Sequence, residues 1–298
     1  CLIGGSADLA PSTNTLIGNS EYITKNKFNG RNLAFGIREH GMGGIINGLA
    51  LYGGFIPFGA TFLVFSDYMR PAIRIAALSE LHAIYIFTHD SIFLGEDGPT
   101  HQPVEHLAAL RVIPNLNVIR PADGPEVTAS WCQALKDKTG PTAILLTRQK
   151  TGTIDRNVKF NFAQAQKGGY IVYKEKKDFP DLVILSSGSE VSLSVQAAKI
   201  LEKDIAVRVI SVPSLVTFQK QDSNYIKELI PLNSKVAVVE AALTQGWGDF
   251  IRQNLYKIDL SSFGKSAPYK DLMANFGFTP QNIAKELLTW IHKQEDMI

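Results

Sequence analysis

The segment His89–Pro103 (HDSIFLGEDGPTHQP) contains two histidines and three carboxylates within its first thirteen residues. An apolar run, HAIYIFT at 82–88, comes directly before it and is typical of a buried strand. Imidazole and carboxylate groups that converge at a strand end are suited to holding hydroxyl groups and transferring protons. A zinc site is the alternative. However, His89 and His101 are twelve residues apart in a loop without cysteines, which matches no common zinc pattern.

Glu39 lies in the sequence GIREHGM at 36–42, where a predicted strand ends and a predicted helix begins. A carboxylate at this point can simply interact favourably with the helix dipole. It can also contact a ligand, since open α/β sheets bind ligands at the carboxyl ends of their strands. The residues alone leave both interpretations open.

Three aromatic residues, Phe62, Phe65 and Tyr68, recur at intervals of three in TFLVFSDY. If a helix begins this early, the spacing places the three rings on one face. Such a stripe is more often part of a core than of a binding site. A flat heterocycle bound beside Glu39 would nevertheless need a wall of this kind.

Arg148 and Ser12 are weaker candidates. Arg148 follows the last predicted strand of the first half, where its guanidinium can bind carbonyl groups or grip a phosphate with two hydrogen bonds. Ser12 belongs, with Asp8, to a polar turn after the first strand, SADLAPS at 6–12. The pattern by itself favours a structural role for Arg148.

Predicted strands and helices alternate through the first 150 residues, and the strands are apolar throughout. This pattern is typical of a parallel sheet that helices cover on both faces. The predicted strands are 32–37, 56–61, 83–88, 117–119 and 142–147, and the predicted helices are 39–52, 66–79, 103–111 and 123–138. The opening residues, CLIGG, are predicted to be the later part of a strand, and they do not begin with methionine. We therefore expect a fragment of a longer chain.

A polar, aperiodic segment, 151–167, is predicted as a linker between two domains, 1–150 and 168–298. Beyond it, strands are predicted at 182–186, 207–212 and 236–240, and helices at 190–203, 226–229, 249–255 and 281–293. The turn that ends DLVILSSG can bind an anion, although a simple change of direction is the favoured explanation. We therefore expect an α/β fold, with two three-layer α/β/α domains and mostly parallel sheets.

The composition is that of an ordinary globular protein, with 298 residues, 45% hydrophobic, 19% charged and a net charge of +2. A charge so near zero indicates neither nucleic-acid binding nor attraction to an acidic membrane surface. The uncharged segment 41–66 is long enough to span a membrane, but its seven glycines and one proline favour a buried helix followed by a strand. Two cysteines and no recognisable leader predict a cytoplasmic location.

Six motifs, in the same order along the chain, are similar to those of transketolases. They are GGSADLAPS at 4–12, FGIREHGM at 35–42, TFLVFSDY at 61–68, THDSIFLGEDGPTHQP at 88–103, RPADG at 120–124 and LLTRQ at 145–149. The chain resembles the carboxy-terminal portion of this family, a pyrimidine-binding domain followed by a C-terminal domain. The resemblance implies thiamine diphosphate as the cofactor. It also implies transfer of a two-carbon ketol unit from a ketose phosphate to an aldose phosphate, in the pentose phosphate pathway, through the ylid of the coenzyme.

The resemblance also implies a set of residues around the coenzyme. Glu39 would hydrogen-bond the aminopyrimidine ring and favour the imino tautomer, which removes the proton from the thiazolium carbon. Phe62, Phe65 and Tyr68 would line the pyrimidine pocket, with Phe65 stacked on the ring. Asp8 would lie near the coenzyme.

A second implied set contacts the sugar. His89 and His101 would bind its hydroxyl and carbonyl oxygens and assist proton transfer, and so act as catalytic residues together with Glu39. Asp97 would recognise a hydroxyl group next to the reacting carbon. Ser12 and Arg148 would bind the terminal phosphate of the substrate. We expect sugar phosphates of the xylulose 5-phosphate and ribose 5-phosphate class.

The family's first domain, which holds the diphosphate through Mg²⁺ or Ca²⁺, has no counterpart in this sequence. No metal ligand is therefore predicted in the chain itself. In such enzymes the coenzyme lies between this pyrimidine domain and the diphosphate domain of a second subunit. We therefore expect a homodimer, and we expect the isolated chain to be inactive.

Related enzymes are less favoured by the motifs. Deoxyxylulose-phosphate synthase and the beta subunits of oxo-acid dehydrogenases share the acid at Glu39, but the unbroken GEDGPTHQP at 95–103 favours transketolase. Dihydroxyacetone synthase is a closer alternative. A non-catalytic dimerisation or regulatory module is another, and the intact set of site residues argues against it.

Overall fold

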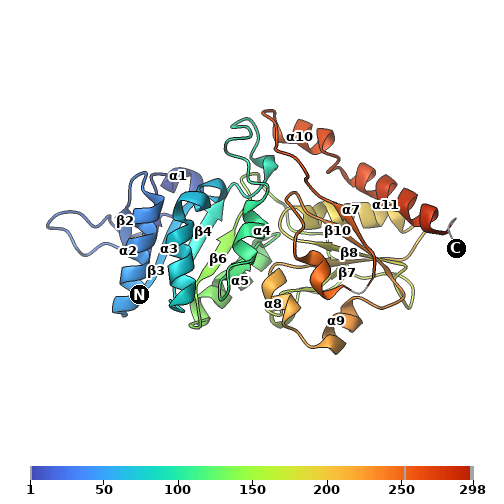
Figure 1. Cartoon of the computed structure of the whole chain (residues 1–298), viewed down its shortest axis with the longest axis horizontal. Helices are drawn as coiled ribbons and strands as arrows, with labels where there is room; N and C mark the ends of the chain where they lie inside the picture. Colours follow the sequence, from blue (N-terminus) through green and yellow to red (C-terminus); the bar gives the residue numbers. More distant parts are fainter. Residues whose placement is uncertain (1, 252, 296–298) are drawn as a thin grey trace.

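The computed structural model describes residues 2–251 and 253–295, and Figure 1 shows two sheets side by side. Within these residues, the first sheet has six parallel strands in the order β2-β1-β3-β4-β6-β5. They are β1 (Leu2–Ser6), β2 (Asn32–Ala34), β3 (Ile56–Phe62), β4 (Ile84–Thr88), β5 (Asn117–Ile119) and β6 (Thr142–Leu145). Every residue of β4 and β6 is buried, which explains why these strands read as continuous apolar runs.

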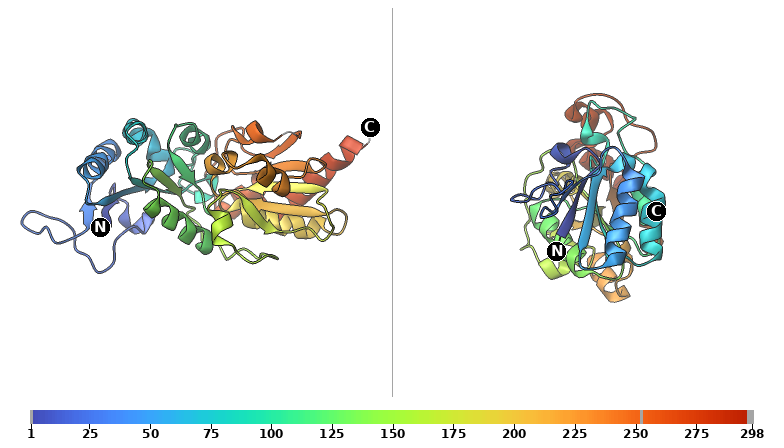
Figure 2. Two further views of the ribbon diagram at one scale, coloured as in Figure 1. Left: turned by 90° about the horizontal axis from the view of Figure 1, so that it is seen from below. Right: turned by 90° about the vertical axis from the view of Figure 1, so that its left-hand side faces the viewer.

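Helices cover both faces of the first sheet (Figure 2). On one face lie α2 (Glu39–Tyr52), α3 (Ser66–Leu78) and α4 (His106–Arg111), which share a core with Tyr85 and Phe87 of β4. On the other face, α5 (Gly124–Lys136) packs through Ala134 against side chains of β3 and β4. The short elements α1 (Ala10–Thr13), η1 (Leu63–Phe65) and η2 (Ile92–Leu94) follow β1, β3 and β4.

A close approach between α2 and β3 fixes the start of α2 relative to the sheet. A Cβ atom on Gly59 of β3 would lie 2.2 Å from Cδ1 of Ile46 and 3.1 Å from Cγ of Met42. Only a glycine therefore allows α2 to pack this closely on the strand. Because α2 begins at Glu39, this contact also determines where that carboxylate lies.

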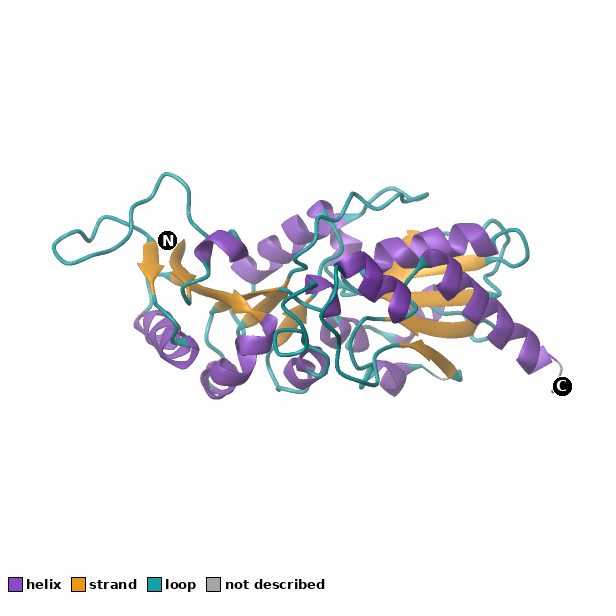
Figure 3. Cartoon of the chain, turned by 90° about the horizontal axis from the view of Figure 1, so that it is seen from above, coloured by secondary structure: helices purple, strands orange, loops and turns teal. Residues whose placement is uncertain are grey.

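The second sheet has five strands within the described residues, in the order β11-β10-β8-β9-β7, and only β7 is antiparallel to its neighbour. They are β7 (Tyr170–Tyr173), β8 (Leu182–Ser186), β9 (Val207–Ser211), β10 (Lys235–Val239) and β11 (Leu255–Ile258). Helices α7 (Glu190–Leu201) and α11 (Pro280–Glu295) pack on one face, seen beside the strands in Figure 3. The elements α8 (Leu215–Gln219), α9 (Ser223–Leu229) and η3 (Trp247–Phe250) pack on the other. The expected α/β fold with two mostly parallel sheets is confirmed.

One predicted element of the second half is wrong, and several observed elements were not predicted. The predicted helix at 249–255 is wrong, since η3 ends at Phe250 and Leu255 begins β11; Arg252 lies outside the described residues. Neither β7 nor β11 was predicted, and both are edge strands of only four residues. The sequence also gave no sign of α8 or of α10 (Tyr269–Asn275), and the predicted linker contains the short helix α6 (Phe162–Ala165). Near the site, the strand predicted at 32–37 ends at Ala34, because Gly36 adopts a φ of 68° and turns the chain.

The uncharged segment 41–66 is folded as predicted, with α2 followed by β3. Among the described residues, no helix combines the length and the apolar character that a membrane span requires.

Candidate active site

A cavity of about 530 Å³ opens at the carboxyl ends of β1 and β3, beside the start of α2. Its position is the usual one for ligands in open α/β sheets. Nine residues line it: Ala7, Asp8, Leu9, Ile37, Glu39, Phe62, Phe65, Tyr68 and His101. Six of the ten residues predicted for the site are in this lining. The sequence therefore predicted most of the polar and aromatic groups that the fold brings together here.

Glu39 is the first residue of α2, and its side chain is buried, with 8% of its surface exposed. The helix dipole favours a negative charge at this end, as one interpretation of the sequence requires. The carboxylate also faces a cavity lined mainly by apolar and aromatic groups. Burial against such groups strengthens hydrogen bonding to a polar ligand, because water is largely excluded.

Phe62, Phe65 and Tyr68 form one wall of the cavity. The three rings come from three successive elements and not from one helix, since Phe62 ends β3, Phe65 ends η1 and Tyr68 lies in the first turn of α3. The rings still line up because η1 is a 3₁₀ turn. A 3₁₀ turn has three residues per turn, so side chains three positions apart lie on the same side. The rings of Phe62 and Phe65 are stacked, with centroids 5.9 Å apart and planes inclined by 11°. His101 meets Phe65 edge-on, with centroids 5.5 Å apart.

His89 directly follows β4 and has a φ of 58°, an unusual backbone conformation for a residue with a side chain. Its buried imidazole stacks on Phe62, with ring centroids 3.6 Å apart, and its Nδ1 lies 2.9 Å from Oγ1 of Thr88. Burial, followed by the positive charge of Arg148, lowers the pKa of His89 to about 4, against the opposing effects of Asp97 and Asp90. The imidazole is therefore neutral at neutral pH and able to accept or to donate a hydrogen bond.

The loop after β4 carries Asp97 and His101, and two glycines with positive φ, Gly95 and Gly98, give it its shape. Asp97 is exposed, and it is near enough to His89 to affect the pKa of that imidazole. His101 lies at the rim of the cavity, with its Nδ1 3.0 Å from Oγ1 of Thr100. The loop thus places a carboxylate and an imidazole beside the opening.

Ser12 and Arg148 are exposed and lie outside the lining of the cavity. Ser12 belongs to α1, and the turn that leads into this helix is fixed by Ser6, whose Oγ donates to the carbonyl of Ala60 and accepts from the amide of Leu9. Arg148 follows β6, and its charge acts on His89. Within the described part of the chain, no three His, Cys, Asp or Glu side chains are grouped to hold a metal ion.

Comparison with family models decides the family. Residues 1–153 match the model of the transketolase pyrimidine-binding domain, and residues 168–279 match that of the transketolase-like C-terminal domain. The chain belongs to the transketolase family.

Curated transketolases are similar over nearly the whole chain. The enzyme from Aquifex aeolicus is 48% identical over 96% of this chain, and that from Bacillus subtilis is 45% identical over 98%. The matched regions are only 42% and 44% of those proteins, so the chain spans less than half the length of these relatives.

Solved transketolase structures share the fold. The transketolase from Leishmania mexicana has a TM-score of 0.90 and 42% identity. The match covers 96% of this chain and 42% of the Leishmania chain. A Pichia stipitis transketolase in complex with xylulose 5-phosphate has a TM-score of 0.92 and 37% identity, over 99% of this chain and 44% of its own. A split-gene transketolase described as an inactive beta4 tetramer matches 97% of this chain and 91% of its own chain. Its identity is 24% and its TM-score is 0.76, so this match supports the fold alone.

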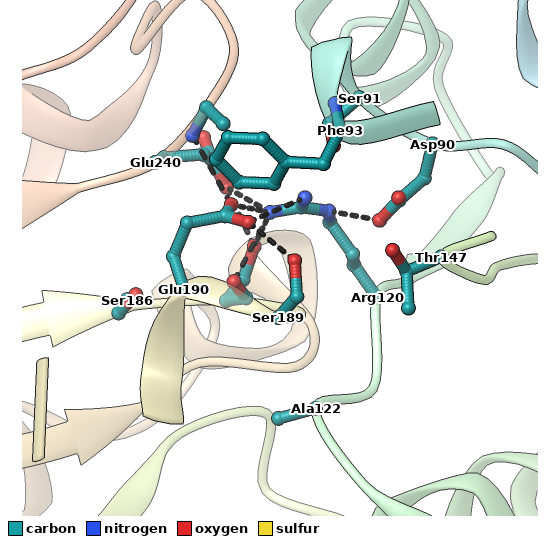
Figure 4. A network of polar contacts seen from close by, with 12 residues as sticks. Asp90, Ser91, Phe93, Arg120, Ala122, Thr147, Ser186, Ser189, Glu190 and Glu240 are labelled. Carbon is teal, nitrogen blue, oxygen red and sulfur yellow. Dashed lines mark hydrogen bonds and ion pairs between the residues drawn. The ribbon is translucent and has the colours of Figure 1, made fainter. Parts of the chain in front are cut away.

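One group near this cavity was missed by sequence reasoning. Arg120, with no exposed surface, donates from Nε to Oδ2 of Asp90 at 2.7 Å, and Asp90 is the residue after His89 (Figure 4). The same guanidinium binds both carboxylate oxygens of Glu190 and, at 3.0 Å, the carbonyl of Ser187. The only sequence signal was Arg120 in RPADG. The small-residue turn before Glu190 therefore contacts a guanidinium and not an anion.

Glu240 extends this network within the second half. Arg111 donates to both carboxylate oxygens of Glu240, at 2.8 and 2.9 Å, and Trp247 donates from Nε1 at 2.7 Å. Burial opposes ionisation of Glu240, but Arg111 and Arg120 together lower the pKa of this carboxyl. Arg111, the last residue of α4, and Arg120, the residue after β5, are thus paired with Glu240 and Glu190 of the second half.

Proposed function

We propose that this chain is the pyrimidine-side portion of a transketolase. Such an enzyme reversibly transfers a two-carbon ketol unit from a ketose phosphate to an aldose phosphate, in the pentose phosphate pathway. The observation that carries the proposal is the cavity that joins buried Glu39 to the aromatic wall of Phe62, Phe65 and Tyr68. The family membership and the similarity to curated transketolases support it.

The residues of this cavity suit the aminopyrimidine of thiamine diphosphate. The ring of Phe65 is half-buried and offers a face for stacking, and Ile37 and Leu9 supply apolar surface. The buried carboxylate of Glu39 is placed to accept a hydrogen bond from a protonated ring nitrogen. When bound, the coenzyme supplies a nucleophilic carbon and an electron sink.

Three residues of the chain act on protons. Glu39 holds a proton on the aminopyrimidine ring and so selects its tautomer. His89, neutral because of its burial, accepts or donates a hydrogen bond at a sugar oxygen. His101, at the rim of the cavity, is the second imidazole that contacts the sugar. Asp8, with its φ of 61°, lies at the same cavity near the coenzyme.

The substrate contacts the loop after β4 and the exposed segment after β6. Asp97 accepts a hydrogen bond from a hydroxyl group next to the reacting carbon, and Ser12 and Arg148 bind the terminal phosphate. The exposure of all three supports contact with a substrate that arrives from solvent. Structures of the Pichia stipitis relative contain xylulose 5-phosphate and sedoheptulose 7-phosphate, which supports sugar phosphates as substrates here.

The diphosphate and its Mg²⁺ or Ca²⁺ require a further part of the enzyme, corresponding to the portion of the longer relatives that this chain does not match. We propose a homodimer in which that part comes from another subunit, and a cytoplasmic location. Apolar side chains before and along α2 are exposed, which supports an interface on this helix: Ile37, Ile45, Leu51 and Tyr52. We further propose a division into a pyrimidine-binding domain (1–150), a linker (151–167) and a C-terminal domain (168–298).

A coupled ketol-transfer assay tests the proposal. The chain is assayed alone and after mixing with the diphosphate-binding half of the Bacillus subtilis relative, with thiamine diphosphate, Mg²⁺, xylulose 5-phosphate and ribose 5-phosphate. We expect no turnover by either half alone and turnover by the mixture. If the mixture forms a complex that binds the coenzyme without turnover, the chain is a non-catalytic dimerisation or regulatory module.

A further inference from the structure

The loop 95–102, which carries Asp97 and His101, is covered by a segment of the second half of the chain. This segment, Gly264–Tyr269, is called the clasp here. It leads into α10, and Figure 1 shows the two meeting at the top of the molecule. More than 160 residues separate the two in sequence, and their contacts are specific side-chain contacts.

Gln102 connects the loop to the clasp. Only 2% of its surface is exposed, and its Nε2 lies within hydrogen-bond distance of three carbonyl oxygens: 2.8 Å from Lys265 in the clasp, 3.0 Å from Gly95 and 3.2 Å from Ile92. One amide group therefore joins both ends of the loop to the clasp. A shift of the clasp would break this set of contacts.

A second contact holds the middle of the loop. Oγ of Ser266 donates to the carbonyl of Glu96 at 2.5 Å, directly before Asp97. A Cβ atom on Gly98 would lie 3.2 Å from Cβ of Ser266, so the clasp lies tightly over the residue after Asp97 as well. The backbone on both sides of this carboxylate is thus fixed from outside the first half.

The clasp itself can lie this close only because residue 264 is a glycine. A Cβ atom on Gly264 would lie 1.7 Å from Oε1 and 2.8 Å from Cδ of Gln102, and 3.0 Å from Cγ2 of Ile92. Beyond the clasp, the chain is anchored by Phe278, whose ring meets Phe93 edge-on with centroids 5.7 Å apart. Both rings belong to the core cluster that includes side chains of β8 and α7, so the chain beyond the clasp is anchored in that core.

We propose that the clasp positions Asp97 and His101 for the sugar, so that the second half of the chain sets the affinity of the enzyme for its substrate. The inference rests on the proposed ketol-transfer function, and it gives the otherwise unassigned C-terminal portion a role at the site. Gly264, Gln102 and Ser266 act as positioning residues and do not touch the substrate. Eight of the nine residues that line the pyrimidine cavity belong to other elements, and His101 lies at its rim, so its affinity for the coenzyme depends far less on the clasp than its affinity for the sugar does.

The test compares Gly264→Ala and Ser266→Ala with a matched control, Ser262→Ala, an exposed serine just before the clasp. In the reconstituted enzyme, KM for xylulose 5-phosphate is expected to rise about tenfold in Gly264→Ala, since small displacements of positioning groups have effects of this size. A smaller rise is expected in Ser266→Ala. The dissociation constant of thiamine diphosphate should stay within about twofold in both variants, and Ser262→Ala should match the unmodified enzyme.

A second readout does not depend on activity. Amide hydrogen exchange in residues 95–102 of the chain should be faster in both clasp variants and unchanged in the control. Unchanged KM in Ser266→Ala and Gly264→Ala overturns the inference, as does an equal loss of affinity for sugar and coenzyme. If Gly264→Ala does not fold, the result for Ser266→Ala decides the test, because this change only removes a hydroxyl group. If the reconstituted enzyme with the unmodified chain shows no turnover, the proposed function is overturned and not the role of the clasp. Unchanged hydrogen-exchange rates in the clasp variants would in that case still overturn the role of the clasp.

Discussion

Arg120 donates from Nε to Oδ2 of Asp90 at 2.7 Å, and both side chains are almost completely buried. Asp90 follows His89, whose backbone has a φ of 58°. Unusual conformations of this kind persist where the surrounding contacts hold them in place. The guanidinium supplies such a contact, and Glu190 of the second half binds its other side (Figure 4).

Replacement of Arg120 should be strongly destabilising. The change Arg120→Met leaves the carboxylates of Asp90 and Glu190 buried without their counter-charge, which typically costs about 3–5 kcal/mol. Urea denaturation measures the loss in free energy of unfolding. Arg74→Met, at an exposed position of α3, is the control and should change stability by less than about 0.5 kcal/mol. An equally small effect at Arg120 would contradict the structure.

The pKa of His89 gives a pH prediction. Burial and the charge of Arg148 lower this pKa from 6.5 to about 4, so the folded chain resists protonation that the unfolded chain accepts. Stability from this group is complete above pH 6.5 and is lost as the pH falls toward 4. NMR titration of the imidazole should give an apparent pKa near 4. Over this pH range the His89→Gln variant should lose less stability than the unmodified chain. Titration of His89 with a pKa near 6.5 would contradict the buried environment described for it.

Two glycines test the packing of α2 on β3. Gly59→Ala places a methyl group 2.2 Å from Ile46 and should lower the free energy of unfolding by about 1–3 kcal/mol. Gly48→Ala, within α2, meets nothing within 4 Å and should raise stability by about 0.5–1 kcal/mol. Thermal denaturation of both variants shows whether the effects have opposite signs. A destabilised Gly48→Ala would contradict the packing described here.

Arg148 should matter only for phosphorylated substrates. Loss of hydrogen bonds to a charged group typically costs about 1.5–3 kcal/mol, which is roughly a 10- to 100-fold fall in kcat/KM. Arg148→Leu should show this fall with xylulose 5-phosphate and little change with a ketose donor that lacks the phosphate. Lys150→Leu, exposed two residues further on, is the control. An equal fall with both donors would exclude phosphate binding by Arg148.

The sequence predicted the first half of the fold and most of the cavity, because those signals are local. The glycines and the proline of the uncharged segment 41–66 favoured a buried helix and strand, and Glu39 and the three aromatic residues lie in or next to these elements. The spacing of the rings grouped them correctly although no single helix carries them, since a 3₁₀ turn repeats at nearly the interval of an α-helix.

What the sequence did not predict depends on contacts between distant segments. Glu190 and Arg120 are 70 residues apart, and no spacing rule connects them. Strands β7 and β11 are stabilised by neighbouring strands of the sheet, and their four residues are too few for a clear pattern. Three of the six residues of the clasp are exposed, and its role becomes visible only where Gly264 meets Gln102.

The central claim is that this chain supplies the carboxylate that activates the coenzyme. Glu39→Gln in the reconstituted enzyme tests it most directly, since the amide keeps the shape of the side chain and removes its charge. The account predicts that kcat for ketol transfer falls at least about 100-fold, with unchanged folding, while Glu21→Gln at an exposed position has no effect. Full activity of the Glu39→Gln enzyme would contradict the account.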